Sequence, residues 1–382
     1  MSTVLPRPSA PVQSTLRVAR VEPIAVSLPM VKPVKMSFEE VRRAENLLVR
    51  VETEDGTVGW GEAASAPTMT GETVTGMAAA VSYLAPLLRG ANAGDPGAAM
   101  AAVERYLYGN NAAKSAIEMA LYDALGRASG KPLCELLGGQ RRSRIPLLRM
   151  VGTGKMETDV EEARRSRVEG YIAYKIKVGV ADPKADAART RAVCEVLGPD
   201  VLVCADANQA WSPEEAVAYV TAVADTTLAF FEQPVAAADI AGMARVARAS
   251  RIPIGVDEGL HSMDDLRRHH EAGAAQGCSL KTIKLGGVKP VADAALLCET
   301  LGMQINLACK IAESGIATAA MLHLAAVAPN VNWGVSLTSQ YLAEDIVRGL
   351  PAVVRGHLEV PTGPGLGIDV DEARVRAHAR TA

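Results

Sequence analysis

The chain has 382 residues, of which 49% are apolar, so it is long enough to bury one large core and a smaller one. Forty basic and forty-three acidic side chains leave a formal net charge of -3, without the long basic block that favours nucleic acid or anionic membranes. No uninterrupted run of about 18 apolar residues is present, which argues against a membrane span. The composition therefore favours a two-part globular enzyme that acts on small molecules.

The cysteines are scattered, with no CxxC pair and no His/Cys spacing of a zinc site. We expect them to be reduced and mostly buried, as in a cytoplasmic protein. Residues 1–16 are rich in Pro, Ser and Val and lack the continuous apolar segment of a signal peptide. They are predicted to form a disordered tail.

The first part of the chain predicts strands followed by helices. Strands are expected over residues 18–27, 46–52 and 58–62, with a loop over residues 28–41. Glu54-Asp55-Gly56-Thr57 is typical of a hairpin turn between the second and third strands. Helices are expected over residues 74–88, 97–107 and 112–129. Together these elements predict an α+β domain over residues 17–140.

After Leu137-Gly138-Gly139, strand-like and helix-like stretches alternate. Candidate strands begin near Ile145, Ile172, Val201, Leu228, Ile252, Ser279, Met303 and Asn332. Short apolar strands separated by helices fit a parallel barrel, which is buried on both faces of its sheet. We expect this barrel over residues 141–340, with residues 341–382 returning to the first domain. The active site of such a barrel lies at the carboxyl ends of its strands.

Three acids follow successive strands of this predicted barrel. Glu232 comes 26 residues after Asp206, and Asp257 comes 25 residues after Glu232. This interval is about one strand, one helix and two short loops, so each acid should occupy the same place on its unit. Any one acid could instead cap the helix that follows it. Together they offer hard oxygen ligands, which suit Mg²⁺ best.

Lysines stand at both limits of this run of acids. Lys175 and Lys177 are two apart on a strand, so they share a face, and neighbouring cations should lower their pKa values. A pair of surface or salt-bridged lysines is the alternative. Lys281 and Lys284 are three apart and cannot both point inward from a regular strand. We expect Lys281 to point inward, across the barrel mouth from Lys177, and Lys284 to have an outward or structural role.

Two other polar residues lie near the predicted strand ends. Asn208 follows the first acid and could orient a ligand or cap the next helix. Glu313 follows the seventh strand and could bond the substrate or a lysine.

These residues resemble the enolase superfamily, in particular its muconate lactonizing enzyme subgroup. The motifs that carry the resemblance are Lys175-x-Lys177, Asp206-Ala207-Asn208, Glu232-Gln233-Pro234, Asp257-Glu258, Lys281-x-x-Lys284, Gly59-Trp60-Gly61-Glu62 and Pro364-Gly365-Leu366-Gly367. The resemblance implies an α/β fold, a modified TIM barrel of the (β/α)₇β type. It also implies an N-terminal α+β capping domain that the C-terminal segment completes. The eighth strand should therefore depart from the regular (β/α)₈ plan.

The resemblance also implies a chemistry. Asp206, Glu232 and Asp257 would bind Mg²⁺, for which Mn²⁺ could substitute, beside an enolate formed next to a substrate carboxylate. Lys177 and Lys281 would be acid/base groups on opposite faces of the substrate, and Lys175 would tune Lys177. Glu258, next to a ligand, would support the site and only secondarily act as a ligand.

The strongest likeness is to the cycloisomerases, through Trp333-Gly334 and Glu313-x-Gly315-Ile316. No histidine lies near Leu307, as a mandelate racemase would require, and no Asp-x-Asp pair follows the eighth strand, as in dipeptide epimerases. Lys310 departs from the cycloisomerase pattern and could pair with Glu313 or with a second anionic group of the substrate.

Several alternatives remain open. One is a racemase or epimerase of an amino-acid derivative, such as an N-acyl amino acid or a proline derivative, because the same two lysines would serve it. A syn dehydratase is another, and a barrel that binds a carboxylate without turnover is a third. The resemblance further implies a symmetric homo-oligomer, from dimer to octamer.

Overall fold

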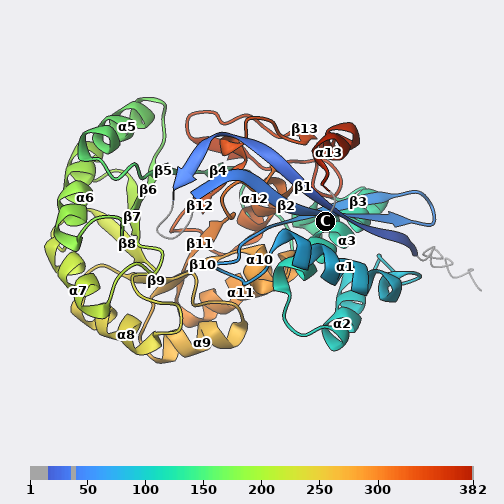
Figure 1. Ribbon diagram of the computed structural model, residues 1–382, viewed down its shortest axis with the longest axis horizontal. Coiled ribbons are helices and arrows are strands. Elements are labelled where there is room, and N and C mark those ends of the chain that lie inside the picture. Colours follow the sequence, from blue (N-terminus) through green and yellow to red (C-terminus); the bar gives the residue numbers. More distant parts are fainter. Residues whose placement is uncertain (1–15, 36–39, 381–382) are drawn as a thin grey trace, which may run out of the picture.

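The computed structural model describes residues 16–35 and 40–380 (Figure 1). The predicted tail, except for residue 16, and residues 36–39 of the predicted loop lie outside the described residues. A parallel barrel enclosed by helices occupies one side of the molecule, and a smaller antiparallel sheet with its own helices occupies the other. The expected domain limits of 17–140, 141–340 and 341–382 remain predictions.

The smaller sheet is an antiparallel meander. Its strands are β1 (Val18–Lys35), β2 (Glu40–Thr53) and β3 (Val58–Ala64). The loop expected over residues 28–41 is wrong for the described part, because β1 and β2 continue to pair there, from Leu28↔Ala44 to Val34↔Val41. The ladder shifts register between Pro29 and Val34. Such an irregularity accommodates Pro29 and Pro33, which cannot donate to a ladder.

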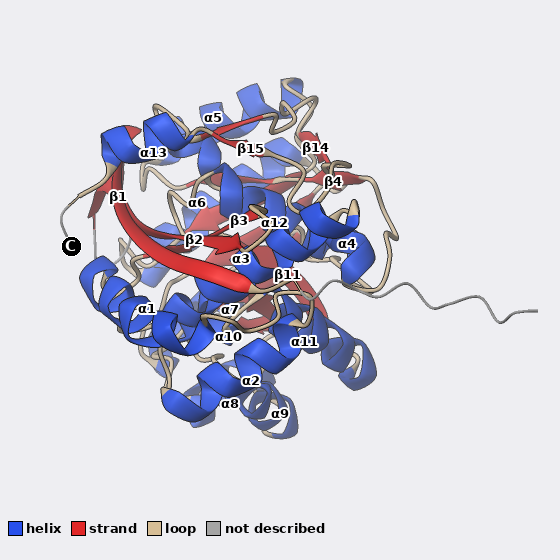
Figure 2. Ribbon diagram, turned by 90° about the vertical axis from the view of Figure 1, so that its right-hand side faces the viewer, coloured by secondary structure: helices blue, strands red, loops and turns tan. Residues whose placement is uncertain are grey.

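The helices of this region follow the predicted positions within about one residue. They are α1 (Val74–Leu88), α2 (Pro96–Tyr106), α3 (Asn111–Ser129) and the short α4 (Leu133–Leu136). Figure 2 shows β1 and β2 as long curved strands with α1 and α2 on one side of them. Residues 112–124 of α3 are all buried, so this helix is enclosed on every side.

Two glycines of β3 allow α3 to approach the sheet closely. A Cβ atom on Gly59 would lie 2.1 Å from the carbonyl oxygen of Ala120, and one on Gly61 would lie 2.0 Å from that of Ala116. Both distances are far below van der Waals contact, so any larger residue would force the helix away. The alternating glycines of the Gly-Trp-Gly-Glu motif therefore set the distance between sheet and helix.

The barrel is an eight-stranded parallel sheet in chain order. Its strands are β5 (Leu148–Val151), β6 (Ala173–Lys177), β7 (Leu202–Asp206), β8 (Leu228–Glu232), β9 (Ile254–Val256), β10 (Gly277–Leu280), β11 (Gln304–Ala308) and β12 (Val335–Ser336). The last strand has only two residues, and a single bridge from Leu147 to Val335 brings it to the first. This short closure fits the modified (β/α)₇β barrel.

One predicted barrel strand belongs elsewhere. Ile145 lies in β4 (Arg144–Pro146), which pairs with the antiparallel strand β14 (His357–Glu359) outside the barrel. The first barrel strand is β5 instead. The partner of β4 lies more than 200 residues away in the chain, so local sequence did not distinguish β4 from a barrel strand.

Helices enclose the barrel. They are α5 (Met156–Val168), α6 (Pro183–Leu197), α7 (Pro213–Ala222), α8 (Ile240–Ala249), α9 (Met263–Glu271), α10 (Thr282–Leu285), α11 (Val288–Leu301) and α12 (Gly315–Val327). Side-chain caps fix where several of them begin, for example Asp182 before α6 and Ser212 before α7. Because these caps hold the strand-to-helix loops, they also hold the rim of the barrel.

The C-terminal segment returns to the smaller sheet. It contains the 3₁₀ helix η1 (Ser339–Tyr341), β13 (Val347–Arg348), β14, β15 (Asp369–Val370) and α13 (Glu372–His378). Bridges join Met30 to Leu342 and Val26 to Ala379. All six cysteines are buried, as predicted. Among the described residues, no helix has the length and apolar character needed to cross a membrane.

Two carboxylates of the smaller region accept hydrogen bonds from the first turns of barrel helices. Glu62 accepts from the backbone N–H of Ser314 (2.8 Å), the hydroxyl of Ser314 (2.7 Å) and the N–H of Ala317 (3.0 Å). Glu118 accepts from the N–H of Val288 (2.5 Å). Burial raises the pKa of Glu62 to about 7 and that of Glu118 to about 8. These contacts attach the smaller region to α12 and α11.

Replacing Glu62 by Ala should lower the free energy of unfolding by about 3 kcal/mol, because several buried donors would lose their acceptor. Urea unfolding measures the change. The matched control is Glu359→Ala, which removes a carboxylate that is 61% exposed and 3.7 Å from Arg144. It should change stability by less than about 0.5 kcal/mol. Equal effects of the two substitutions would contradict the attachment through Glu62.

Candidate active site

The strand register aligns the three acids in one row at the barrel mouth. Lys177 pairs with Asp206, Asp206 with Glu232, and Glu232 with Gly255 in adjacent parallel strands. Asp257 lies two residues beyond Gly255, on the same face of the chain. All three acids are almost completely buried. The even spacing of acids in the sequence thus becomes a single row in space.

Two lysines of β6 contact the first two acids. The Nζ of Lys177 donates to Asp206 Oδ2 at 2.6 Å, and the Nζ of Lys175 donates to Glu232 Oε2 at 2.7 Å. Burial alone would lower the pKa of Lys175, but Glu232 and Asp206 outweigh it and raise the pKa well above its usual value. Carboxylates surround the Lys175 ammonium group and hold its pKa high. The expected lowering by neighbouring cations, which include Mg²⁺, stays a prediction.

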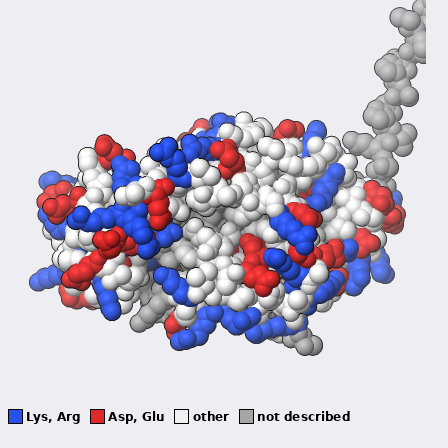
Figure 3. Space-filling view, turned by 90° about the horizontal axis from the view of Figure 1, so that it is seen from above, with Lys and Arg blue, Asp and Glu red and all other residues white. Residues whose placement is uncertain are grey.

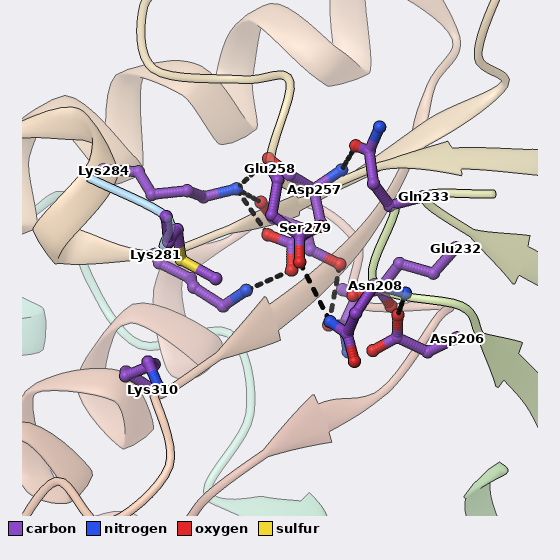
Figure 4. A network of polar contacts seen from close by, with 12 residues as sticks. Asp206, Asn208, Glu232, Gln233, Asp257, Glu258, Ser279, Lys281, Lys284 and Lys310 are labelled. Carbon is purple, nitrogen blue, oxygen red and sulfur yellow. Dashed lines mark hydrogen bonds and ion pairs between the residues drawn. The ribbon is translucent and has the colours of Figure 1, made fainter. Parts of the chain in front are cut away.

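Lys281 and Lys284 both contact the third acid. Strand β10 ends at Leu280, and the chain turns into α10, so strand alternation no longer applies. Lys281 donates to Asp257, while Lys284 donates to Asp257 Oδ1 (2.6 Å) and to the carbonyl oxygens of Asp257 (2.5 Å) and Ser279 (2.8 Å) (Figure 4). The outward orientation considered for Lys284 is wrong, and its contacts are those of a structural residue.

Burial alone would raise the pKa of Asp257, but these two ammonium groups hold it well below its usual range. Burial lowers the pKa of Lys284 itself. Asp257 therefore remains ionised, and Lys284 fixes its position from the side away from the cavity.

Asn208 connects a lysine to a fourth acid. Its Oδ1 accepts from the Nζ of Lys177 (2.7 Å), and its Nδ2 donates to Glu258 Oε1 (2.9 Å). The alternative role as a helix cap is wrong, because Ser212 caps α7. Burial, reinforced by Asp257, raises the pKa of Glu258 to about 7. Asn208 therefore orients the ammonium group of Lys177. The sequence had left open whether Asn208 orients a ligand or caps a helix.

Gln233 is a positioning residue that the sequence pattern only partly indicated. Its Oε1 accepts from the backbone N–H of Asp257 (2.9 Å) and of Gly259 (3.1 Å), so it fixes the end of β9 from the end of β8. Its φ is 36°, and left-handed φ values also occur at Asn208 (43°) and Ala312 (68°). These strained residues all follow barrel strands, where strain is often kept for function.

Lys310 and Glu313 occupy the loop after β11. Lys310 lines the cavity at the barrel mouth and stands to one side of the carboxylate network (Figure 4). Glu313 is buried and does not line this cavity; its Oε2 accepts from the backbone N–H of Lys310 at 3.0 Å. Of the two contacts expected for Glu313, with the substrate or with a lysine, the structure shows one with the backbone of Lys310. A contact with the substrate stays a prediction. Glu313 supports the loop that presents Lys310.

The cavity at the barrel mouth has a volume of about 70 Å³. The acids and lysines form one side, on β6 to β10. The opposite side is mostly apolar, and it is formed by Leu148, Met150, Ala308, Ile311, Leu337 and Tyr341. Met69 of the smaller region also lines the cavity. The sequence carried no signal for these residues beyond their places at strand ends.

A second cavity adjoins the first. It has a volume of about 620 Å³ and shares Met150, Lys177 and Tyr341 with the first cavity. Its other walls come from β1, including Lys32, and from α5. On the face seen from above, basic and acidic side chains are interspersed around an uncharged area (Figure 3).

The donor set suits a hard divalent cation. Among the described residues, no group of three His, Cys, Asp or Glu side chains converges closely enough to hold a metal ion. Each of the three acids contacts a lysine ammonium group. The three acids nevertheless supply carboxylate oxygens on one face of the mouth. Glu232 Oε1 is buried without a hydrogen-bond partner among the described residues, which leaves one oxygen available for a cation.

Comparisons with known proteins identify the family. Residues 20–138 match the mandelate racemase / muconate lactonizing enzyme N-terminal domain, and residues 158–374 match the enolase C-terminal domain-like family. The chain belongs to the enolase superfamily, in its muconate lactonizing enzyme subgroup. The relatives of this subgroup are named as cycloisomerases, so the chain is an enzyme of the isomerase type.

Three similar proteins illustrate the likeness. A chloromuconate cycloisomerase of Cupriavidus pinatubonensis is 33% identical over 94% of this chain and 97% of its own length. The muconate lactonizing enzyme of Pseudomonas fluorescens, solved with muconolactone, has a TM-score of 0.91 at 30% identity and covers 96% of this chain and 100% of its own. An N-succinyl Arg/Lys racemase from Bacillus cereus has a TM-score of 0.90 at 27% identity and covers 96% and 98%.

Within this enolase-superfamily site, Glu313 should make stability depend on pH. Burial, reinforced by Glu62, raises its pKa from 4.5 to about 8. The folded chain then binds more protons than the unfolded chain between these two values, so stability falls as pH rises through this window. Between pH 6 and 8 the loss due to Glu313 is about 2 kcal/mol.

Glu313→Gln, which cannot ionise, should remove this loss. Urea unfolding at pH 6, 7 and 8 measures the slope of stability against pH in both proteins. Glu62, which has a pKa of about 7 and is coupled to Glu313, titrates in the same window, so the difference in slope measures Glu313 together with its coupling to Glu62. Groups that are not coupled to Glu313 titrate in both proteins and cancel in the comparison. Parallel slopes would show that Glu313 is not held neutral by its surroundings.

Proposed function

We propose that this chain is a Mg²⁺-dependent cycloisomerase of the muconate type, which forms a lactone from a dicarboxylate. The observation that carries the proposal is the row of three acids between two opposed lysines. Lys177 ends β6 and Lys281 follows β10, four strands further round an eight-stranded barrel. A substrate held at the acids would therefore have an ammonium or amine group on each face.

Asp206, Glu232 and Asp257 would hold the cation, with Mn²⁺ as a substitute. When bound there, Mg²⁺ would hold a substrate carboxylate and stabilise the negative charge of an enolate. Two observations support a cation at this site: the three carboxylates that could bind it, and the Glu232 Oε1 atom, which is buried and has no hydrogen-bond partner among the described residues. Lys284 and Gln233 keep Asp257 in place, as their contacts indicate.

Lys177 would transfer the proton. In the lactone-forming direction, an oxygen of the distal carboxylate bonds to the diene carbon that is γ to that carboxylate. The π bond between this carbon and the carbon next to the held carboxylate breaks, and its electron pair moves to the latter carbon. The Lys177 ammonium donates a proton to that carbon, and solvent restores the proton to the amine. Asn208 and Asp206, which both contact the Lys177 Nζ, orient the ammonium group for this step. The reverse reaction uses Lys177 as the base.

The relatives support this reaction more than others. The proteins named as muconate and chloromuconate cycloisomerases match nearly the whole chain at 28 to 33% identity. A volume of about 70 Å³ at the barrel mouth suits the reacting half of a small acid.

A homo-oligomer, which the family resemblance implies, is also part of the proposal.

Lactone formation from cis,cis-muconate in deuterated water tests the proposal. The purified protein with Mg²⁺ should place one deuterium on the carbon next to the carboxylate, which mass spectrometry and NMR detect. Lys177→Ala should lower kcat at least 100-fold, the usual effect of losing a general acid. Lys184→Ala, at an exposed lysine of α6, is the matched control and should leave kcat unchanged.

Metal binding completes this test. Asp206→Asn should weaken Mg²⁺ binding at least tenfold in calorimetric titration, because it removes one charged ligand. The proposal fails if no Mg²⁺ binds to the wild-type protein, or if Lys177→Ala retains full activity.

A second candidate is a racemase of N-acyl amino acids. The observation that favours it is the adjoining cavity of about 620 Å³, which offers more room than a muconate requires. The N-succinyl Arg/Lys racemase of Bacillus cereus, with its TM-score of 0.90, supports the same alternative. Here Lys177 and Lys281 would each handle one enantiomer.

Solvent exchange distinguishes the two reactions. A racemase should exchange the α-proton of both enantiomers of an N-succinyl amino acid with deuterium. Lys177→Ala should then abolish exchange of one enantiomer, and Lys281→Ala should abolish exchange of the other. If neither enantiomer exchanges while muconate is converted, the racemase is excluded.

A further inference from the structure

We propose that Arg189 is a positioning residue for the reaction. Together with Asp159 and Asp186 it holds the backbone around Lys177, so that the Lys177 ammonium group stays directed toward the reacting carbon. The inference rests on the proposed function in one respect, namely that Lys177 transfers the proton. It adds a group of buried residues, outside the catalytic cavity, on which that transfer depends.

Arg189 lies on α6, and its side chain is only 3% exposed. Its Nη1 donates to Asp159 Oδ2 on α5 at 2.6 Å, and its Nη2 donates to Asp186 Oδ1 on α6 at 2.7 Å. Nη2 also donates to the backbone carbonyl oxygen of Lys177 at 2.5 Å. One guanidinium group therefore links two barrel helices to the residue that carries the ammonium group.

The two carboxylates extend this link to the loops after β5 and β6. Asp159 Oδ1 accepts from the backbone N–H of Thr153 (2.9 Å) and from its hydroxyl (2.6 Å) in the first loop. Asp186 Oδ2 accepts from the N–H of Gly179 in the second loop, at 2.7 Å. We call Arg189, Asp159 and Asp186 the Arg189 cluster. Its contacts fix the backbone on both sides of the end of β6.

The loop after β5 also packs directly against the Lys177 side chain. A Cβ atom on Gly152 would lie 2.8 Å from the Cβ of Lys177 and 3.0 Å from its Cγ. Gly152 precedes Thr153, so Asp159 holds the loop at the place where it meets the lysine. A lysine side chain is long and flexible, and support at its Cβ and Cγ restricts the positions that the Nζ can reach.

Stability alone does not account for the Arg189 cluster. Two carboxylates and one guanidinium group are withdrawn from water, and apolar side chains of similar volume would often stabilise the contact between α5 and α6 as well or better. Further round the barrel, Arg245 of α8 pairs with Glu214 of α7 on the surface, where their side chains are 52% and 63% exposed. What the buried cluster adds is a fixed backbone next to Lys177.

The cluster should affect proton transfer and not the cation. Its contacts reach the ends of β5 and β6, whereas the three proposed metal ligands lie at the ends of β7, β8 and β9. Misplacing a reacting group by about 1 Å can cost about 100-fold in rate. Loss of the cluster should therefore lower kcat and leave the KM and the affinity for Mg²⁺ nearly unchanged.

Two substitutions test the inference with cis,cis-muconate and Mg²⁺. Arg189→Lys keeps the positive charge but cannot reproduce the planar fork of donors. Gly152→Ala leaves the cluster intact and adds the Cβ atom that would collide with Lys177. Each should lower kcat at least tenfold, while the KM and the Mg²⁺ affinity stay within twofold. Arg245→Lys, at the exposed ion pair, is the matched control and should leave kcat unchanged.

A double substitution separates positioning from a general loss of structure. Because the cluster acts through Lys177, Arg189→Lys should change the residual kcat of Lys177→Ala by less than twofold. A crystal structure of Gly152→Ala should show the Lys177 Nζ displaced from Asn208 Oδ1, which lies at 2.7 Å in the unmodified protein.

A milder variant covers the case in which Arg189→Lys does not fold. Thr153→Val, at an exposed residue, removes the hydroxyl bond to Asp159 and keeps the backbone one. It should lower kcat about threefold, because the loop that supports Lys177 becomes less well held. Thr153→Val and Gly152→Ala then decide the inference by themselves.

The outcomes separate the two levels of the argument. If Lys177→Ala retains full activity, the proposed function fails, and the assignment of Arg189 fails with it. If Lys177→Ala loses activity while Gly152→Ala and Thr153→Val retain it, the inference alone is overturned. It is also overturned if Arg189→Lys lowers the kcat of Lys177→Ala by the same factor as that of the unmodified protein, since the cluster would then be only structural.

Discussion

The site depends on mutual neutralisation of buried charges. Asp206, Glu232 and Asp257 are almost completely removed from water, and each contacts a lysine ammonium group. Removing one partner from such a pair leaves an unpaired buried charge, which costs several kcal/mol. The strand register, the turn at Gln233 and the contacts of Lys284 can all be understood as devices that keep these opposite charges together.

The smaller region contributes to the same network from outside the barrel. Glu62 binds the first turn of α12, and this turn follows the loop that carries Lys310. The close approach of α3 to β3, which Gly59 and Gly61 allow, places Glu118 against α11. The position of the barrel loops after β10 and β11 is thus linked to packing in a sheet that supplies none of the proposed metal ligands or acid/base lysines.

Sequence alone predicted the parts of the structure that follow the repeating unit. The acids were identified because one β/α unit has a nearly constant length, which places the same position of each strand at the rim. Lys177 and Lys281 followed from the same argument, and the family resemblance supplied the roles of all five residues.

What sequence did not predict had non-local or irregular causes. The strand containing Ile145 pairs with residues near the other end of the chain. Strands β1 and β2 continue to pair beyond a register shift, where a loop was expected. Lys284 turns inward because a short helix replaces the strand after Leu280.

The barrel rim is divided into two arcs with different composition. One arc, from β6 to β10, is charged, and its residues depend on one another, so substitutions there act together. The other arc, from β11 through β12 to β5, is mainly uncharged, and its middle strand, β12, has only two residues in the ladder. Side chains on this second arc can change with little effect on the charge network. A barrel divided in this way can acquire new substrates while its proton-transfer chemistry stays the same.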